Sequence, residues 1–122
     1  MIRCCEDLDV YKKAYEASLK IHRLSMDFPK HEMFELGAQI RRATKSIVMN
    51  VAEGYGKRQS TAEFKRYISM AIGSSEEVKV QLNYCKDLDY INEETHSKYI
   101  AEYTEIAKML MGLYKKWKDL SN

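Results

Sequence analysis

The feature of this sequence that most limits its fold is a three-four spacing of apolar residues along nearly the whole chain. Apolar or small side chains recur at these intervals in four stretches, and only one proline and five glycines interrupt 122 residues. This spacing puts the apolar side chains on one face of an α-helix, whereas a half-buried strand would show strict alternation. The sequence therefore predicts four long amphipathic helices.

The first two helices are predicted to form an antiparallel pair. The first covers residues 8–28, and Pro29 ends it because the residue before a proline disfavours helical geometry. The second covers residues 32–54, and Gly54 and Gly56 suit a left-handed cap at its end. The link between the two helices is too short for anything but an antiparallel return. Candidate N-caps of the first helix are Asp7 and Asp9.

The third and fourth helices have clearer starts. Residues 60–63, Ser-Thr-Ala-Glu, match a capping box, and the helix that follows extends to Cys85. Asn92 is the predicted N-cap of the fourth helix, which extends to about Lys118. Gly73 lies in the middle of the third helix, where a close approach of another helix would explain it. The expected fold is all-α, an antiparallel up-down-up-down four-helix bundle, as a single domain over residues 1–122.

Two features of the predicted helices leave alternatives open. The apolar arc of the fourth helix spans about 160°, wider than the roughly 100° that one core contact needs. The helix therefore either sits deeply in its own core or also covers another subunit. A polar row on the second helix is either a solvated flank or a polar seam against a neighbouring helix or subunit. Its members are Gln39, Arg42, Ser46, Asn50 and Glu53.

We find no pattern of residues typical of a catalytic or metal site, so we expect a protein that is not an enzyme and has no cofactor or metal. The three histidines lie on different predicted elements and pair with no cysteine at ligand spacing. The glycines at 54 and 56 lack the spacing and the preceding strand of a phosphate-binding loop. The three cysteines, the absence of a signal-peptide pattern and the absence of a long apolar run predict a reduced, cytoplasmic protein without a membrane partner.

The charge distribution is more informative than the net charge. The chain carries only +2, yet residues 41–66 hold seven basic and two acidic side chains, a local charge of +5. Basic groups beside tyrosines suit phosphate contact and base stacking, and single-stranded or looped RNA fits better than duplex DNA. The alternative is an ordinary solvated basic surface. The candidate nucleic-acid-binding residues are Arg41, Arg42, Lys45, Lys57, Arg58, Lys65 and Arg66, and the candidate stacking residues are Tyr55 and Tyr67.

Several of these segments also carry a family resemblance. They include Phe28-Pro29, Gln39-Ile40-Arg41-Arg42-Ala43, Asn50-Val51-Ala52-Glu53-Gly54 and Ala71-Ile72-Gly73-Ser74. With them the chain resembles, over residues 8–117, the four-helix bundle family of 23S rRNA-intervening sequence proteins. The resemblance implies an antiparallel bundle that commonly assembles as a homopentamer, with no catalytic residues to transfer. It also implies a structural or interface role for the polar row.

We therefore expect a non-enzymatic, homo-oligomeric bundle that binds RNA or a nucleoprotein through its basic loop end. The alternative is a protein-protein interaction scaffold with no nucleic-acid role. RNA binding that depends on salt favours the first hypothesis, whereas one protein partner recovered regardless of nuclease treatment favours the second.

Overall fold

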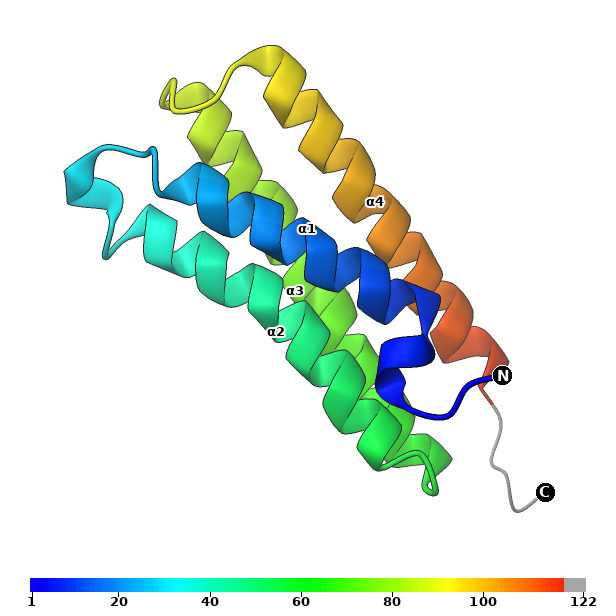
Figure 1. The fold of residues 1–122 in the computed structure, drawn as a ribbon. Coiled ribbons are helices and arrows are strands. Elements are labelled where there is room, and N and C mark those ends of the chain that lie inside the picture. Colours follow the sequence, from blue (N-terminus) through cyan, green and yellow to red (C-terminus); the bar gives the residue numbers. More distant parts are fainter. Residues whose placement is uncertain (118–122) are drawn as a thin grey trace.

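The computed structural model describes residues 1–117, and four long α-helices make up most of this part of the chain (Figure 1). The helices are α1 (Asp9–Ser25), α2 (Leu36–Gly56), α3 (Thr61–Asp87) and α4 (Glu93–Lys116), with two short 3-10 helices, η1 (Cys5–Asp7) and η2 (Lys30–Glu32). No strand occurs among residues 1–117, and the predicted all-α fold is confirmed. The predicted end of the fourth helix, Lys118, lies outside the described residues.

Successive helices reverse direction and lie side by side, as Figure 1 shows. Helices α1 and α3 each contact both α2 and α4, while α1 and α3 do not contact each other. They therefore occupy diagonally opposite corners of the bundle. This arrangement puts the α2–α3 connection and the C-terminal end of α4 at one end of the molecule (Figure 1).

One apolar core runs the length of the bundle and receives the predicted stripe of every helix. Each fully buried aliphatic or aromatic side chain contributes about 1.5–3 kcal/mol to folding. Burial raises the pKa of the Cys85 thiol to about 12, and this residue packs as a small core side chain. Among the fully buried side chains are Ile21, Ile40, Ile47, Phe64, Ile68, Leu82, Tyr103, Ile106 and Leu110.

Two predicted N-caps are present and one prediction is wrong. Ser60 Oγ accepts a hydrogen bond from the backbone N–H of Glu63 at 3.2 Å, and Asn92 Oδ1 accepts one from that of Thr95 at 2.8 Å. These bonds satisfy N–H groups that the first turn of a helix leaves free. Helix α1 has no such cap. Its N-cap is Leu8, and the Asp7 carboxylate instead accepts from the backbone N–H of residue 3.

The start of the second helix differs from the prediction by four residues, because Glu32 has a different role. Its buried carboxylate accepts hydrogen bonds from Tyr90 Oη at 2.7 Å and from the backbone N–H of Leu36 at 3.3 Å. The Tyr90 bond lowers the pKa of the Glu32 carboxyl and raises the pKa of Tyr90 to about 12. Glu32 thus fastens the α1–α2 connection to the α3–α4 connection and caps α2 from outside the helix.

The glycines do not act as predicted from the sequence. Helix α2 continues to Gly56, and neither Gly54 nor Gly56 is left-handed. Gly54 instead lies where α3 approaches closely, since a Cβ there would be 3.1 Å from Tyr67 Cβ and 3.2 Å from the Phe64 carbonyl oxygen. No atom would lie within 4 Å of a Cβ at Gly73, so the expected close approach at that residue is not made inside the described bundle.

The wide apolar arc of the fourth helix is used mostly inside the bundle. Three of its side chains pack against the core: Ile100, Leu113 and Tyr114. Within the described part of α4, Met111 is the one large hydrophobic side chain that is exposed. Most of the exposed large apolar side chains lie instead on α1, on α3 and in the N-terminal and α1–α2 segments. None of the helices described is both long and apolar enough to cross a membrane.

Candidate nucleic-acid interface

The α2–α3 connection presents basic side chains at one end of the bundle because it is short and tightly hydrogen-bonded. The backbone N–H of Lys57 donates to the carbonyls of Glu53 and Gly54, and that of Ser60 donates to the Lys57 carbonyl. Only residues 57–60 separate the two helices. The first turn of α3 is therefore held beside the last turn of α2.

Tyr67 is the centre of the basic cluster. Lys57 Nζ donates a hydrogen bond to Tyr67 Oη at 3.2 Å and lies 5.0 Å from the ring centroid, while the Arg66 guanidinium lies 4.5 Å from the same centroid. The bond to Tyr67 raises the pKa of the Lys57 ammonium group above its ordinary value, which is already far above neutral pH. Two cations beside one partly exposed aromatic ring form a compact group that can meet both a phosphate and a base.

The two neighbouring basic residues of α3, Lys65 and Arg66, differ in whether a carboxylate pairs with them. Arg66 Nε donates to Glu63 Oε2 at 2.9 Å, and this ion pair lowers the pKa of Glu63. Lys65 extends in the other direction, with its ammonium 5.2 Å from the ring of Tyr114 on α4. Exposed ion pairs of this kind are worth only about 0–1 kcal/mol, so a phosphate can compete for Arg66.

Tyr55 does not present a stacking surface. Its ring is only 8% exposed, and the Arg58 guanidinium covers it at 4.1 Å from the centroid. Arg58 also donates to the Tyr55 carbonyl at 3.0 Å, which holds the guanidinium in place. Of the two predicted stacking residues, Tyr67 alone is accessible, and Tyr55 supports Arg58 from below.

Arg41, Arg42 and Lys45 lie away from this cluster, in the N-terminal half of α2. Arg41 donates to Ser25 Oγ at 2.9 Å and to the Met33 carbonyl at 2.6 Å, so it holds the α1–α2 connection at the far end of the bundle. Lys45 Nζ lies 2.9 Å from Nδ1 of His22 on α1. Partial burial, together with the Lys45 and Arg41 charges, lowers the pKa of His22. Arg42 is exposed on α2.

The polar row on α2 is partly a seam and partly solvated. Ser46 Oγ lies 3.0 Å from Ser74 Oγ on α3, and the Asn50 amide donates to Ser46 Oγ at 3.1 Å. Gln39, Arg42 and Glu53 are exposed. The middle of the row therefore fixes the contact between α2 and α3, while its ends remain on the surface.

Two basic residues at the same end were missed by the sequence analysis. Lys115 and Lys116 occupy the last turn of α4, both exposed, at the end of the bundle that holds the α2–α3 connection (Figure 1). The up-down topology was the signal that could have found them. From here on, the basic end means Lys57, Arg58, Lys65, Arg66, Tyr67, Lys115 and Lys116.

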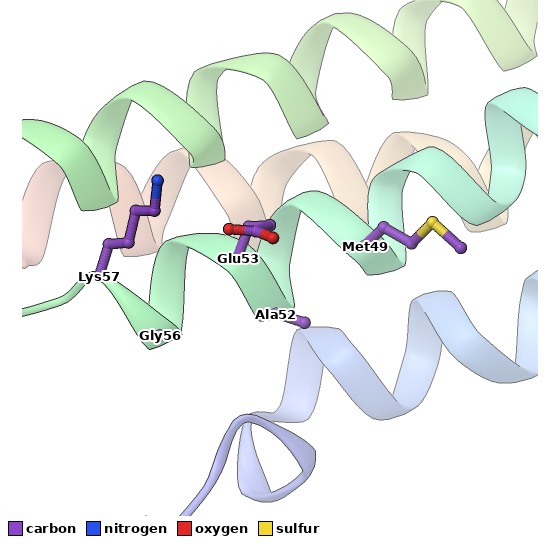
Figure 2. A pocket seen from close by; sticks show the side chains of 5 residues that line it. All are labelled: Met49, Ala52, Glu53, Gly56 and Lys57. Atoms are coloured by element: carbon purple, nitrogen blue, oxygen red, sulfur yellow. The ribbon is translucent and has the colours of Figure 1, made fainter.

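A shallow hollow of about 520 Å³ lies beside the basic end on α2. It is lined by Met49, Ala52, Glu53, Gly56 and Lys57. Figure 2 shows that four of them come from the last turns of α2, that Lys57 follows directly after the helix, and that Ala52 points toward the N-terminal part of the chain. The hollow is an open surface of small and apolar side chains with one carboxylate and one ammonium. It suits contact with another macromolecule better than the enclosure of a small substrate.

Within residues 1–117, no group of three or more His, Cys, Asp or Glu side chains is placed to hold a metal ion. A polar group formed by buried Glu32 with Tyr90 and His31 lies at the end of the bundle opposite the basic end. Its bonds are used to join the two connections there. The arrangement at the basic end offers cations and one aromatic ring, which is binding chemistry.

Comparisons with known proteins agree with the fold. The family model described as 23S rRNA-intervening sequence protein matches residues 6–112. A solved structure of a protein of unknown function from the S23 ribosomal protein family of Bacteroides thetaiotaomicron is 27% identical. It has a TM-score of 0.80 and covers 88% of this chain and 96% of its own. No curated protein matches the chain significantly.

Proposed function

This chain belongs to the 23S rRNA-intervening sequence protein family, and we propose that it is a non-enzymatic, cytoplasmic, homo-oligomeric bundle that binds RNA through its basic end. The observation that carries the proposal is the gathering of six basic side chains from the α2–α3 connection, α3 and α4 at one end of the bundle, where Lys57 and Arg66 lie against the accessible ring of Tyr67. Arg41 and Tyr55 have no part in it, because both are occupied within the bundle.

The proposed contact combines phosphates with an unstacked base. Lys57 and Arg66 are within reach of the backbone of a single strand that passes over the Tyr67 ring, and Lys65 adds a charge on the side toward α4. Single-stranded or looped RNA is favoured, because its bases are free to stack on aromatic side chains. One subunit can neutralise about two to four phosphates, which gives weak and salt-sensitive binding.

Assembly would strengthen that weak contact. A ring of parallel copies presents several basic ends on one rim, and linked sites raise the overall affinity without any new contact. By its family resemblance we propose a homopentamer. Light scattering at micromolar concentration tests this directly, and five times the chain mass of 14.3 kDa is expected. A monomer mass would contradict the proposal.

RNA binding is tested by a titration of labelled, partly single-stranded RNA at several salt concentrations. The double variant Lys57→Glu with Arg58→Glu is expected to weaken binding at least about tenfold. The slope of log K against log salt concentration should become shallower by the amount that about two phosphate contacts contribute. The matched control is Lys30→Glu with Lys98→Glu, which makes the same change of charge with exposed side chains at the other end. The control should bind nearly as the natural chain does.

Two outcomes count against RNA binding. One is the absence of binding at about 50 mM salt, where electrostatic contacts are strong. The other is an equal effect of both pairs of reversals, which would mean that net charge and not the basic end matters. Either outcome would favour the alternative, a protein-protein interaction scaffold, for which the outward apolar side chains on α1 and α3 are the supporting observation.

A further inference from the structure

Two helices carry apolar side chains on their outward faces. The α1 row consists of Tyr15 and Leu19 on α1 and of Met26, the residue directly after this helix, which are 47%, 37% and 54% exposed. The α3 row consists of Met70, Gly73, Val80 and Tyr84 on α3 and of Leu88, the residue directly after this helix. Val80, Tyr84 and Leu88 are each about half exposed. Both rows follow the three-four spacing that keeps side chains on one helical face.

The spacing matters because an outward helix face is normally polar. In this chain α1 and α3 each have a second apolar stripe opposite or beside the one that faces the core. Because α1 and α3 are diagonal and do not touch, the two rows lie on different sides of the bundle. Two unlike faces on different sides of one subunit suit a heterologous contact, in which each copy uses one face toward each neighbour.

Gly73 is the second observation, and it leaves room for a close neighbour at the α3 row. It lies in the middle of a 27-residue helix, where glycine costs about 1 kcal/mol relative to alanine. Gly73 is exposed, and no described atom would touch a Cβ there. Packing inside the chain thus gives no reason for glycine. A helix from outside could approach the backbone at this point.

Charge complementarity identifies the neighbour. Glu77 lies between Gly73 and Val80 on the α3 row, is exposed, and accepts only the Gln81 amide among the described contacts. Beside the α1 row lie Arg23, four residues after Leu19, and Lys45 of α2, whose ammonium reaches His22. Within residues 1–117 neither cation has a carboxylate partner. Each row therefore carries the charge that the other lacks.

The two rows also lie at matching heights along the bundle. Lys45 meets His22 of α1, and the next residue, Ser46, meets Ser74 of α3. His22 and Ser74 therefore lie at similar heights, to within the length of the Lys45 side chain. Glu77 lies three residues beyond Ser74, about 4.5 Å along the axis, which a long basic side chain can span. Copies related by rotation about an axis parallel to the bundle keep their heights, so Arg23 of one copy would face Glu77 of the next.

We propose that the α1 row of one copy packs against the α3 row of the next copy, with the two bundles parallel and with Arg23 and Lys45 facing the neighbour's Glu77. The inference rests on the proposed homo-oligomer and names the faces that build it. Leu19 of one copy then lies against the open surface at Gly73 of the next copy. The basic ends of all copies lie on the same side of the assembly. Lys45, which the sequence offered as a nucleic-acid-binding residue, becomes part of the contact between subunits.

Cysteine cross-linking between copies tests the pairing of the rows. In a chain with Cys4→Ser and Cys5→Ser, Leu19→Cys and Gly73→Cys are made as separate proteins and mixed, while buried Cys85 is kept. A short bismaleimide should join the two variants into dimers only in the mixture. Leu19→Cys alone should stay unlinked, and so should its mixture with Met111→Cys, an exposed position on α4.

Charge exchange gives a second readout that does not depend on linker geometry. Glu77→Arg or Arg23→Glu alone should shift the assembly toward smaller species in light scattering, and the two together in one chain should restore it. An intact oligomer with no Leu19–Gly73 linkage and no charge rescue would overturn the proposed faces while leaving the assembly in place. A monomer for the natural chain would refute assembly itself, whatever its RNA binding.

Discussion

Replacing Phe64 with alanine is expected to lower the free energy of unfolding by about 3–5 kcal/mol. The ring is fully buried near the start of α3 and stacks on Trp117 with 4.0 Å between ring centroids and 15° between planes. This contact fastens the beginning of α3 to the end of α4. Truncation removes the apolar contact and leaves a cavity that the surrounding helices cannot close completely. For 122 residues, each kcal/mol lowers Tm by about 4 °C.

The matched control is Phe34→Ala, which removes the same side chain from a site that is 87% exposed. Its effect on the unfolding free energy should stay within about 0.5 kcal/mol. Urea unfolding followed by circular dichroism measures both variants, at one fixed protein concentration because assembly adds to apparent stability. If Phe64→Ala cost less than about 1 kcal/mol, the ring would not be in the core.

Replacing Gly37 with alanine should destabilise the bundle by about 1–3 kcal/mol, although alanine is the better helix former. A Cβ at this position would lie 2.7 Å from the Glu32 carbonyl oxygen and 3.0 Å from Arg41 Nη1. The first of these is backbone, held in the turn that precedes α2, so it cannot move cheaply. The α1–α2 connection would have to shift, which would disturb the Glu32–Tyr90 and Arg41–Ser25 bonds.

The same substitution at Gly112 should have the opposite sign. Gly112 lies inside α4, and no described atom comes within 4 Å of a Cβ built there. Alanine at this position should raise the unfolding free energy by about 0.5–1 kcal/mol, because glycine loses more backbone freedom on folding. Thermal unfolding of the two variants side by side measures the difference. Equal effects at Gly37 and Gly112 would contradict the close contact at Gly37.

The sequence predicted part of the candidate site, namely the basic residues on either side of the α2–α3 connection. Four of the seven basic candidates, Lys57, Arg58, Lys65 and Arg66, lie at one end of the bundle because a four-residue connection holds their helices side by side. The sequence could not show that Tyr55 is covered and Arg41 is hydrogen-bonded, because whether a ring or a guanidinium is free depends on the contacts that surround it. Helical spacing places a residue on a face but does not say what covers that face.

The glycines show the same division. The local pattern suggested caps at Gly54 and Gly56 and a close contact at Gly73. The structure puts the close contacts at Gly54 and Gly37 and leaves Gly73 open. Every glycine permits a close approach, and the crossing of helices decides which glycine is needed.

What the sequence determined by itself is local. Three-four spacing requires helices, and Ser60 and Asn92 fix two of their starts, since both effects act within a few residues of the chain. The tertiary structure decided the rest. The Glu32 carboxylate, predicted to begin a helix, joins the α1–α2 connection to the α3–α4 connection, and the Tyr55 ring is buried. Lys115 and Lys116 lie at the basic end, and the apolar rows of α1 and α3 face outward. These features depend on which side chains meet across the bundle, and residues far apart in the chain meet only once it has folded.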